Sequence, residues 1–152
     1  MNPSYKPLVQ LVIGFLDIRD RSELEIRQYL TKKTADQAVI DQVISYLIDH
    51  NLINDRNFGL AWAESRVRRQ KGDIQIIREL TQKGLSKESV HQIVDAIDSA
   101  DWFSAMELLV SKKAAKYSKL NPYQQKAKNY QLLAQHGYSS KLIDAFLRHK
   151  VE

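Results

Sequence analysis

The sequence predicts an all-α fold in which three small units of three helices each follow one another as a tandem array. The first observation is a repeat: Leu80–Ser86 and Leu133–Ser139 share the pattern Leu-x-Gln-x-Gly-x-Ser. A degraded third copy starts at Leu30, with Thr34 in place of the glycine. The second observation is the helical spacing of apolar residues, without sustained strand-like alternation. The third is that prolines occur only at positions 3, 7 and 122, so none interrupts a helix between residues 8 and 121.

Self-similarity at a period of about 50 residues is typical of a unit that is repeated in space and stacks on its neighbours. We expect the units to span residues 1–51, 52–99 and 100–152, each with a longer first helix and two shorter helices joined by a tight turn. One such unit cannot bury its apolar faces alone, so adjacent units must pack together. An array of this kind forms an extended surface rather than one enclosed pocket.

In the first unit, Ser22–Glu25 has the pattern of a capping box and predicts the start of a helix. The Ser22 hydroxyl can accept a hydrogen bond from an amide of the first turn, and the Glu25 side chain can reach back. A later helix is predicted by apolar residues at i, i+3, i+4 and i+7 spacing. These residues are Ile40, Val43, Ile44 and Leu47.

In the second unit, Asn54 before Asp55 predicts a helix start by N-capping, and a contact of this pair with a partner protein is the alternative. The apolar stripe that follows consists of Phe58, Ala61, Trp62 and Ser65. Gly84 fits the left-handed position that ends a helix. Two further N-cap candidates follow glycines: Asp73, which follows Gly72, and Ser86.

In the third unit, helical spacing predicts a long first helix whose apolar stripe consists of Phe103, Met106, Val110, Ala114 and Tyr117. Asn121–Gln124 forms a second capping box, with Pro122 at the first helical position. Gly137 and Ser139 repeat the end and start signals of the second unit. Across the second and third units, we expect four aromatic residues in the core: Phe58, Trp62, Trp102 and Phe103.

The composition excludes several function classes. The chain has no cysteine, which removes disulfides, thiolate metal sites and cysteine nucleophiles. Its four histidines are scattered, without a pair at i and i+4, and it has no phosphate-binding loop that ends in Gly-Lys-Ser/Thr. We therefore expect no catalytic residues, no metal and no cofactor. The apolar stretch over residues 8–16 is too short to span a bilayer, so we expect a soluble, cytoplasmic protein that does not bind membranes.

Positive charge is unevenly distributed in this chain, whose formal net charge is +5. No acidic residue lies between Glu107 and Asp144, and the same span contains Lys112, Lys113, Lys116, Lys119, Lys126, Lys128 and Lys141. A second basic stretch contains Arg66, Arg68, Arg69, Lys71, Arg78 and Lys83. Such a distribution favours binding to polyanions. The alternatives are a solvated helix face for the lysines and favourable placement near a helix C-terminus for the arginines.

Tyrosines are interleaved with the lysines of the third unit, namely Tyr117, Tyr123, Tyr130 and Tyr138. Stacking of single-stranded bases on tyrosine rings is one interpretation. The interpretation that we prefer is that Tyr117 and Tyr130 lie at the edge of the core with their hydroxyls in water.

Short segments spread over residues 8–147 carry a family resemblance. In chain order they are Arg21–Leu30, Leu52–Phe58, Ser65–Arg66, Lys71–Gly72, Ile77–Leu80, Lys83–Leu85, Lys126–Lys128, Leu132–Leu133 and Gly137–Tyr138. Individually these motifs are weak, but in this order and at this spacing they are specific. The chain resembles the RecX family, the bacterial regulators of the RecA recombinase.

The resemblance implies an elongated, curved molecule of three three-helix units that lies in the groove of the RecA–single-stranded-DNA filament. It implies inhibition of the ATPase, strand-exchange and co-protease activities of RecA, and with it a role in homologous recombination, DNA repair and the SOS response. The partners would be the RecA filament and the backbone of single-stranded DNA, and we expect a monomer. The predicted contact residues are Arg66, Arg68, Arg69, Lys71, Arg78, Lys83, Lys112, Lys113, Lys116 and Lys126.

Two other functions fit the same residues. The chain could bind nucleic acid by itself, without sequence preference and without a recombinase. It could also be a helical scaffold for an acidic partner protein, in which case DNA would be irrelevant.

Overall fold

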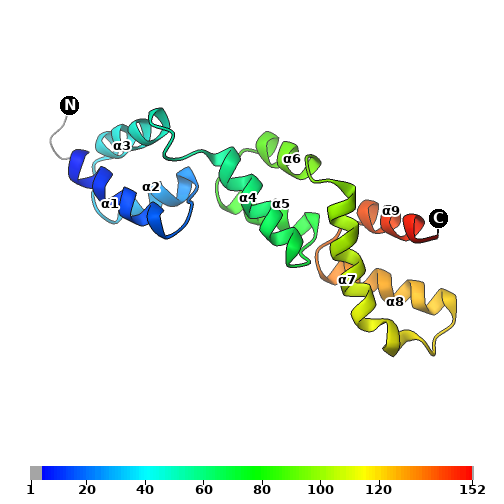
Figure 1. Cartoon of the computed structure of the whole chain (residues 1–152). Helices are drawn as coiled ribbons and strands as arrows, with labels where there is room; N and C mark the ends of the chain where they lie inside the picture. The colour runs from blue at the N-terminus through cyan, green and yellow to red at the C-terminus, as the bar shows by residue number, and fades with distance from the viewer. Residues whose placement is uncertain (1–4, 152) are drawn as a thin grey trace.

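The computed structural model describes residues 5–151, and within them all regular structure is helical. The chain forms an elongated array in which three groups of three helices follow one another (Figure 1). The predicted all-α array is thereby confirmed. Residues 1–4 and 152, which the predicted first and third units include, lie outside the described residues. The helices are α1 (Tyr5–Ile18), α2 (Glu23–Thr31), α3 (Gln37–Asp49), α4 (Asp55–Arg68), α5 (Asp73–Gln82), α6 (Lys87–Asp95), α7 (Ser99–Tyr117), α8 (Pro122–Gln135) and α9 (Ser140–Val151).

Most of the predicted helix starts are confirmed by side-chain caps. Ser22 and Asn121 each form a complete capping box, with Glu25 and Gln124 as the reciprocal partners. Three further side chains accept a hydrogen bond from a first-turn amide, namely Asn54, Ser86 and Ser139. These caps satisfy amides that have no partner within the helix, so the starts are determined by local sequence.

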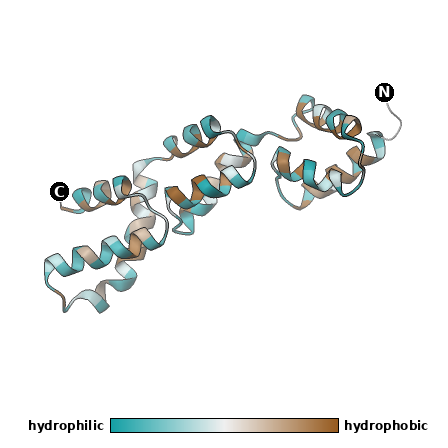
Figure 2. Ribbon diagram, turned by 180° about the vertical axis from the view of Figure 1, so that it is seen from behind, coloured by the Kyte–Doolittle hydropathy of each residue, from teal (hydrophilic) through white to brown (hydrophobic). Residues whose placement is uncertain are grey.

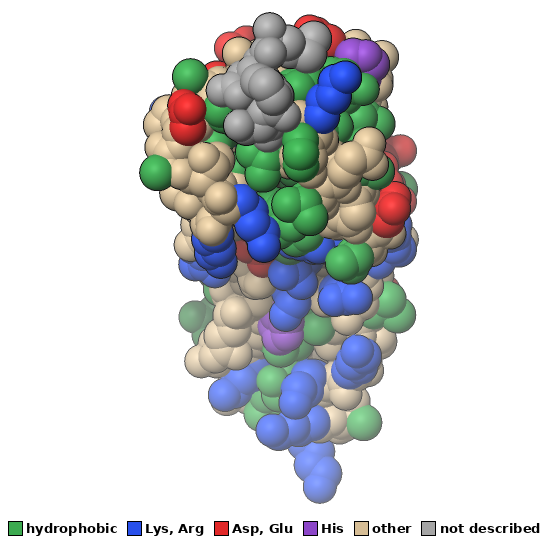
Figure 3. All heavy atoms as spheres, turned by 90° about the vertical axis from the view of Figure 1, so that its left-hand side faces the viewer, with side chains coloured by type: hydrophobic (Ala, Val, Ile, Leu, Met, Phe, Trp, Pro, Cys, Tyr) green, Lys and Arg blue, Asp and Glu red, His purple; other side chains and the backbone are tan. Residues whose placement is uncertain are grey.

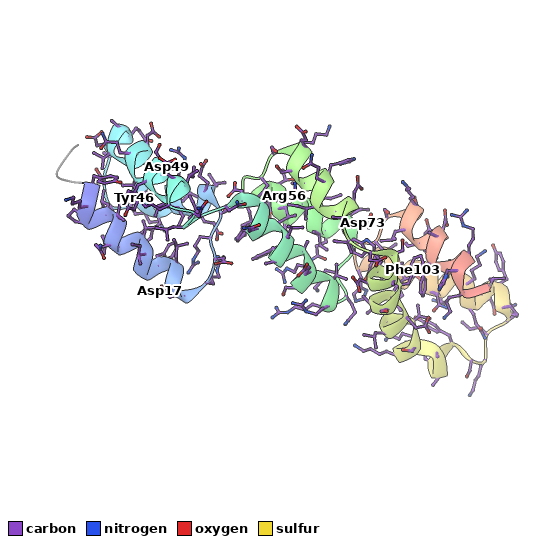
Figure 4. All side chains as sticks on the ribbon, turned by 45° about the horizontal axis from the view of Figure 1, so that its top comes forward. Asp17, Tyr46, Asp49, Arg56, Asp73 and Phe103 are labelled. Atoms are coloured by element: carbon purple, nitrogen blue, oxygen red, sulfur yellow. The ribbon has the colours of Figure 1, made fainter. Side chains whose placement is uncertain are left out.

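The prediction that Asp73 caps α5 is wrong. Gly72 is the N-cap residue and makes no side-chain cap, whereas Asp73 is the first residue of the helix. The carboxylate of Asp73, which is labelled in Figure 4, instead accepts a hydrogen bond at 2.7 Å from the backbone N–H of Ser139 in the next unit. Asp73, which the sequence suggested as a helix N-cap, therefore makes a contact between two units instead.

Two predicted apolar stripes differ from the buried faces. On α4, Ala61 is exposed and Trp62 is half-buried, whereas the buried residues are Phe58, Gly59, Ala63 and Val67. Helix α4 packs against α5, α6 and α7, so neighbours on several sides determine its buried face. On α7, Ala114 is exposed, because burial on this helix ends at Val110. Among the predicted core aromatics, Phe58 and Trp102 are buried, and Trp62 and Phe103 are half-buried against the same core.

The apolar residues form two separate cores rather than three. One core contains buried residues from Tyr5 to Ile53 and belongs to the first unit alone. The other runs from Phe58 to Phe146 and is shared by the second and third units. Figure 2 shows apolar and polar residues alternating around the helices, as expected for helices that bury one face. The second and third units are thus joined by a continuous core, whereas the first unit is not.

Both junctions between units are close contacts between a glycine turn and the start of a helix in the preceding unit. Gly84 follows α5 with φ of 89°, and a Cβ on it would lie 2.6 Å from the Leu24 Cβ of α2. Gly137 follows α8 with φ of 86°, and a Cβ on it would lie 2.9 Å from the Gln75 Cβ of α5. The repeated glycine thus ends a helix and also lets two units approach closely.

Backbone hydrogen bonds join the second unit to the third. The Gly72 N–H donates to the carbonyl of His136, and the Ile74 N–H donates to that of Gly137, both at 2.9 Å. The turn of the first unit carries Thr34, which does not have positive φ. Each of the two junctions uses the turn of the following unit, and both of these turns carry glycine.

No helix among the described residues is long and apolar enough to cross a membrane.

We expect that replacing either junction glycine by alanine destabilises the protein. Gly137→Ala combines an unfavourable left-handed alanine with a Cβ pressed against α5, and a loss of about 1–3 kcal/mol in the free energy of unfolding is expected. Gly14→Ala is the matched control, because Gly14 lies within α1 and a Cβ there meets nothing within 4 Å. That variant should be as stable as the parent, or more stable by about 0.5–1 kcal/mol. Urea unfolding followed by circular dichroism measures both, and equal effects of the two substitutions would contradict the proposed role of the turn.

Candidate functional site

The most distinctive surface is a helical hairpin made by the end of α7, the connecting loop and most of α8. We call residues 111–131 the basic hairpin. None of these residues is buried, although most are helical. Its cations are Lys112, Lys113, Lys116, Lys119, Lys126 and Lys128. The hairpin therefore extends beyond the apolar core of the second and third units, against which its Tyr130 packs.

Local hydrogen bonds hold the basic hairpin together in place of a core. The capping box of Asn121 and Gln124 fixes the start of α8, where Pro122 occupies the first turn. The Gln125 side chain donates to the carbonyl of Leu120 at 2.8 Å, and the Ser118 hydroxyl donates to that of Ala115 at 2.7 Å. The lysines are thus displayed on an ordered backbone without being needed for its packing.

Positive charge on the basic hairpin is not neutralised within the protein. Over residues 5–151, none of its six lysines forms an ion pair with a carboxylate. Figure 3, which views the array from its N-terminal side, shows Lys and Arg side chains gathered over the lower part, whereas the visible acidic side chains lie higher. Five of the six lysines are exposed and Lys113 is half-buried, and unpaired lysines in such density favour an anionic partner. The predicted contacts Lys112, Lys113, Lys116 and Lys126 all lie here.

Two of the other predicted contact residues are engaged inside the protein. Arg66 Nε lies 2.7 Å from Glu79 Oε1, and the guanidinium lies over the Trp62 ring, 4.8 Å from its centroid. Lys83 Nζ lies 3.2 Å from Glu25 Oε2 and 5.0 Å from the same ring centroid. Both side chains are only about one quarter exposed, at 26% and 27%. Their structural contacts compete with any contact to an external anion.

The remaining predicted contact residues of the second unit differ in exposure and in the charges around them, so they do not form one basic patch. Arg69 and Arg78 are exposed, and Lys71 is half-buried. Arg68 is exposed as well, but it lines a groove together with the carboxylates of Glu64, Asp98 and Asp101. Those carboxylates would repel a phosphate, so Arg68 is poorly placed to bind one. These residues are close together in the sequence, but the helices place their side chains in different environments.

Glu25 is the residue that sequence analysis left out of the site, although it organises the junction of the first and second units. Its carboxylate accepts from Arg19 Nη2 at 2.5 Å, from the Ser22 N–H at 3.1 Å and from Lys83 Nζ at 3.2 Å. Burial by itself would raise the pKa of Glu25, but these hydrogen bonds together hold it below its usual value. The capping-box pattern identified only the local bond to Ser22. Nothing in the sequence indicated the partner 58 positions away.

A second carboxylate crosses the same junction. Asp55, the first residue of α4, accepts a hydrogen bond from the Glu23 N–H of α2 at 2.7 Å. Burial raises the pKa of Asp55, against the lowering effect of this bond, and the nearby carboxylates of Glu23 and Glu25 raise it further. The first junction is therefore polar and is supported by charges and hydrogen bonds, whereas the second combines hydrogen bonds with a continuous apolar core.

The tyrosines near the basic hairpin differ in exposure. Tyr138 is 2% exposed, and its ring packs edge-on against Trp102, so it cannot stack on a base. Burial raises the pKa of its hydroxyl. Tyr117 and Tyr130 are half-buried, and Tyr123 is 82% exposed. Of the four tyrosines, Tyr123 is the one whose ring is largely accessible.

No group of three or more His, Cys, Asp or Glu side chains in the described part of the chain is arranged to hold a metal ion.

Comparison with known protein families matches three consecutive parts of the chain. The first, second and third three-helix domains of RecX match residues 10–47, 54–92 and 100–147. A regulatory protein RecX of Listeria welshimeri is 33% identical over 138 residues, which cover 88% of this chain and 50% of that protein. A regulatory protein RecX of Bacillus thuringiensis is 31% identical over 89% of this chain and 50% of that protein. This chain thus spans about half the length of the curated relatives that it matches.

Two crystal structures share the fold. RecX from Lactobacillus salivarius superposes with a TM-score of 0.87 and 22% identity, over 95% of both chains. Another regulatory protein RecX superposes with a TM-score of 0.77 and 17% identity, over 95% of this chain and 71% of the other. The relatives are described as regulatory proteins, in agreement with the expectation that this chain is not an enzyme.

We expect Glu25→Gln to weaken the first junction and to reduce its sensitivity to acid. Because the pKa of Glu25 is lowered by folding, its contribution is complete above the unfolded value of about 4.3 and is lost as the pH falls through the folded value. At pH 7 the variant should lose about 1–2 kcal/mol of unfolding free energy, because charge-assisted hydrogen bonds are replaced. Asp144→Asn, at an exposed position of α9, is the control. Urea unfolding between pH 7 and pH 3 tests this, and an unchanged acid dependence in Glu25→Gln would refute it.

Proposed function

This chain belongs to the RecX family, and from that premise we propose that it is a negative regulator of the RecA recombinase that binds the RecA–single-stranded-DNA filament. The observation that carries the proposal is the basic hairpin. Its lysines form no ion pair among the described residues, and none of its residues is fully buried, so core packing does not explain its composition. An ordered, projecting cationic element is suited to contact with the phosphate backbone inside a nucleoprotein filament.

Lysine side chains determine what kind of contact this is. An ammonium group on a flexible stem follows phosphates as a point charge and carries no information about base sequence. A regulator of a filament that forms on any single-stranded DNA needs contacts of this kind. We therefore assign Lys112, Lys113, Lys116 and Lys126 to the backbone contact, with Arg69, Lys71 and Arg78 as contacts of the second unit. Lys83 acts in the junction of the first and second units instead, and Arg66 acts within the second unit.

The elongated array supports contacts with more than one filament component. Three stacked units present surface along the length of the molecule (Figure 1). Once one weak contact has formed, the others form at a high effective concentration because they lie on the same molecule. A filament is therefore bound far more tightly than a single subunit or a short piece of DNA. We expect a monomer to bind in this way and thereby to inhibit the ATPase, strand-exchange and co-protease activities of RecA.

The second candidate function is direct binding of nucleic acid without a recombinase. The same hairpin favours it, because exposed lysines attract any polyanion. The two functions differ in preference: a regulator binds RecA-coated DNA more tightly than naked DNA, and a stand-alone binder does not.

We expect the chain to inhibit RecA ATP hydrolysis on single-stranded DNA when it is present well below the RecA concentration. The variant Lys112→Glu/Lys116→Glu/Lys126→Glu should need at least about tenfold more protein for half-inhibition, since three lost contacts of about 0.5–1 kcal/mol each exceed the 1.4 kcal/mol of a tenfold change. The matched control is Lys6→Glu/Lys32→Glu/Lys87→Glu, which makes the same charge change at exposed lysines of other helices and loops.

Binding to naked and RecA-coated single strands, measured at several salt concentrations, separates the candidate functions. Absence of ATPase inhibition at any ratio, together with retained binding to naked DNA, would contradict the regulator and favour the stand-alone binder. Equal loss of inhibition in both triple variants would show that net charge, rather than the basic hairpin, is responsible.

A further inference from the structure

A second surface differs from the basic hairpin in both polarity and charge. It is a groove of about 580 Å³ between α4, α6 and α7, at the junction of the second and third units. The apolar part of its lining includes Leu60, Ala63, Val67, Ile93, Ile97 and Leu108. Leu108 is 53% exposed, a large apolar side chain left in contact with water in the middle of α7. The groove therefore offers apolar area that the fold itself does not cover.

The rim of this groove is acidic, although the chain as a whole is basic. The carboxylates of Glu64, Asp98 and Asp101 lie along it, with Arg68 as the one cation of the lining. Among the described residues, these three carboxylates form no ion pair. Asp98 is the N-cap residue of α7, yet its side chain makes no capping hydrogen bond. Helix capping thus does not account for the Asp98 carboxylate, which stays free to accept from a ligand.

A contact in the neighbouring hollow shows a lysine paired with an acidic residue of α7. On the other side of α7, a shallower hollow is lined by residues of α7 and α9, and Ser104 and Leu108 border both hollows. There Lys150 of α9 places its ammonium 3.0 Å from a Glu107 carboxylate oxygen and 5.6 Å from the centre of the Phe146 ring. A lysine of α9 thus pairs with a carboxylate of α7 while its ammonium lies over an aromatic ring of its own helix.

We propose that the groove between α4, α6 and α7 binds a cationic amphipathic helix of a partner protein. Its apolar face would lie on Leu60, Ile97 and Leu108, which are half-buried or exposed, and its Lys or Arg residues would reach Glu64, Asp98 and Asp101. Helix-in-groove recognition uses this combination of apolar anchors with complementary charge. Nucleic acids and anionic lipids are disfavoured, because their phosphates would face three carboxylates. The inference does not depend on the proposed regulation of RecA.

Synthetic helices test the groove directly. The probe is a fluorescein-labelled peptide of about 14 residues, or four turns, with Leu at i, i+3, i+4 and i+7 spacing and Lys elsewhere. One comparison peptide has Glu for Lys, and another has the same Leu and Lys residues in an order without helical spacing. Fluorescence anisotropy with the full chain should show saturable binding of the first peptide, and binding at least about tenfold weaker for each of the others.

Two variants test the apolar contact and the charge contact separately. Leu108→Lys should weaken binding about tenfold by placing a charge in the apolar floor, and Leu11→Lys is its control at another exposed leucine. Glu64→Gln/Asp98→Asn/Asp101→Asn should weaken binding by a similar factor at low salt and less at high salt. Its control is Asp17→Asn/Asp49→Asn/Asp144→Asn, with the same charge change at exposed sites. Circular dichroism and the midpoint of urea unfolding establish that each variant is folded.

Loss of binding in the two groove variants, with retention in both controls, is the expected result. The proposal is overturned if the Leu–Lys peptide does not bind saturably or if the Leu–Glu peptide binds as well. It is also overturned if the groove variants and their controls weaken binding equally, because that would reflect general attraction to acidic surface.

Discussion

The close contact between a glycine turn and the start of a helix in the preceding unit sets the geometry of the whole array. At Gly84 and Gly137 the left-handed backbone ends one helix, and the missing Cβ lets the turn lie directly against Leu24 or Gln75. A bulkier residue would push consecutive units apart and change the direction of every element beyond it. The orientation of the basic hairpin and the width of the α4–α6–α7 groove therefore both depend on the lack of a side chain at Gly84 and Gly137.

The glycine contact occurs at both junctions, but the interactions that stabilise each junction in addition to it differ. Between the second and third units, it is reinforced by backbone hydrogen bonds from Gly72 and Ile74 and by one continuous apolar core. Between the first and second units, the support is a network of charges around Glu25, Lys83 and Trp62. Hydrophobic packing is insensitive to pH and salt, whereas partly exposed ion pairs respond to both. The first unit is consequently the part of the array whose attachment depends most on solution conditions.

Helix α7 combines two roles along its 19 residues. Up to Val110 it is buried on one side and carries two acidic residues, Asp101 and Glu107, whereas its last seven residues include no buried one and carry three lysines. Acidic residues near the start of a helix and basic residues near its end agree with the helix dipole, so the polarity is compatible with helix stability. The consequence is that one helix supplies both an acidic, apolar groove and a cationic hairpin. The two surfaces suit ligands of opposite charge.

The sequence by itself determined the helical class, the repeat of three units, and most helix starts, because caps such as Ser22 and Asn121 and glycines such as Gly84 act within a few residues of the chain. It also located the lysines of the basic hairpin, since an absence of acidic residues can be seen without a structure. Only the tertiary structure decided which Lys and Arg side chains are engaged by other residues of the protein and which are not. Arg66 and Lys83 look like Arg69 and Arg78 in the sequence, but partners 13 and 58 positions away hold them in place. The buried faces of α4 and α7 were likewise decided by neighbouring helices, because periodicity identifies an apolar face but not what covers it.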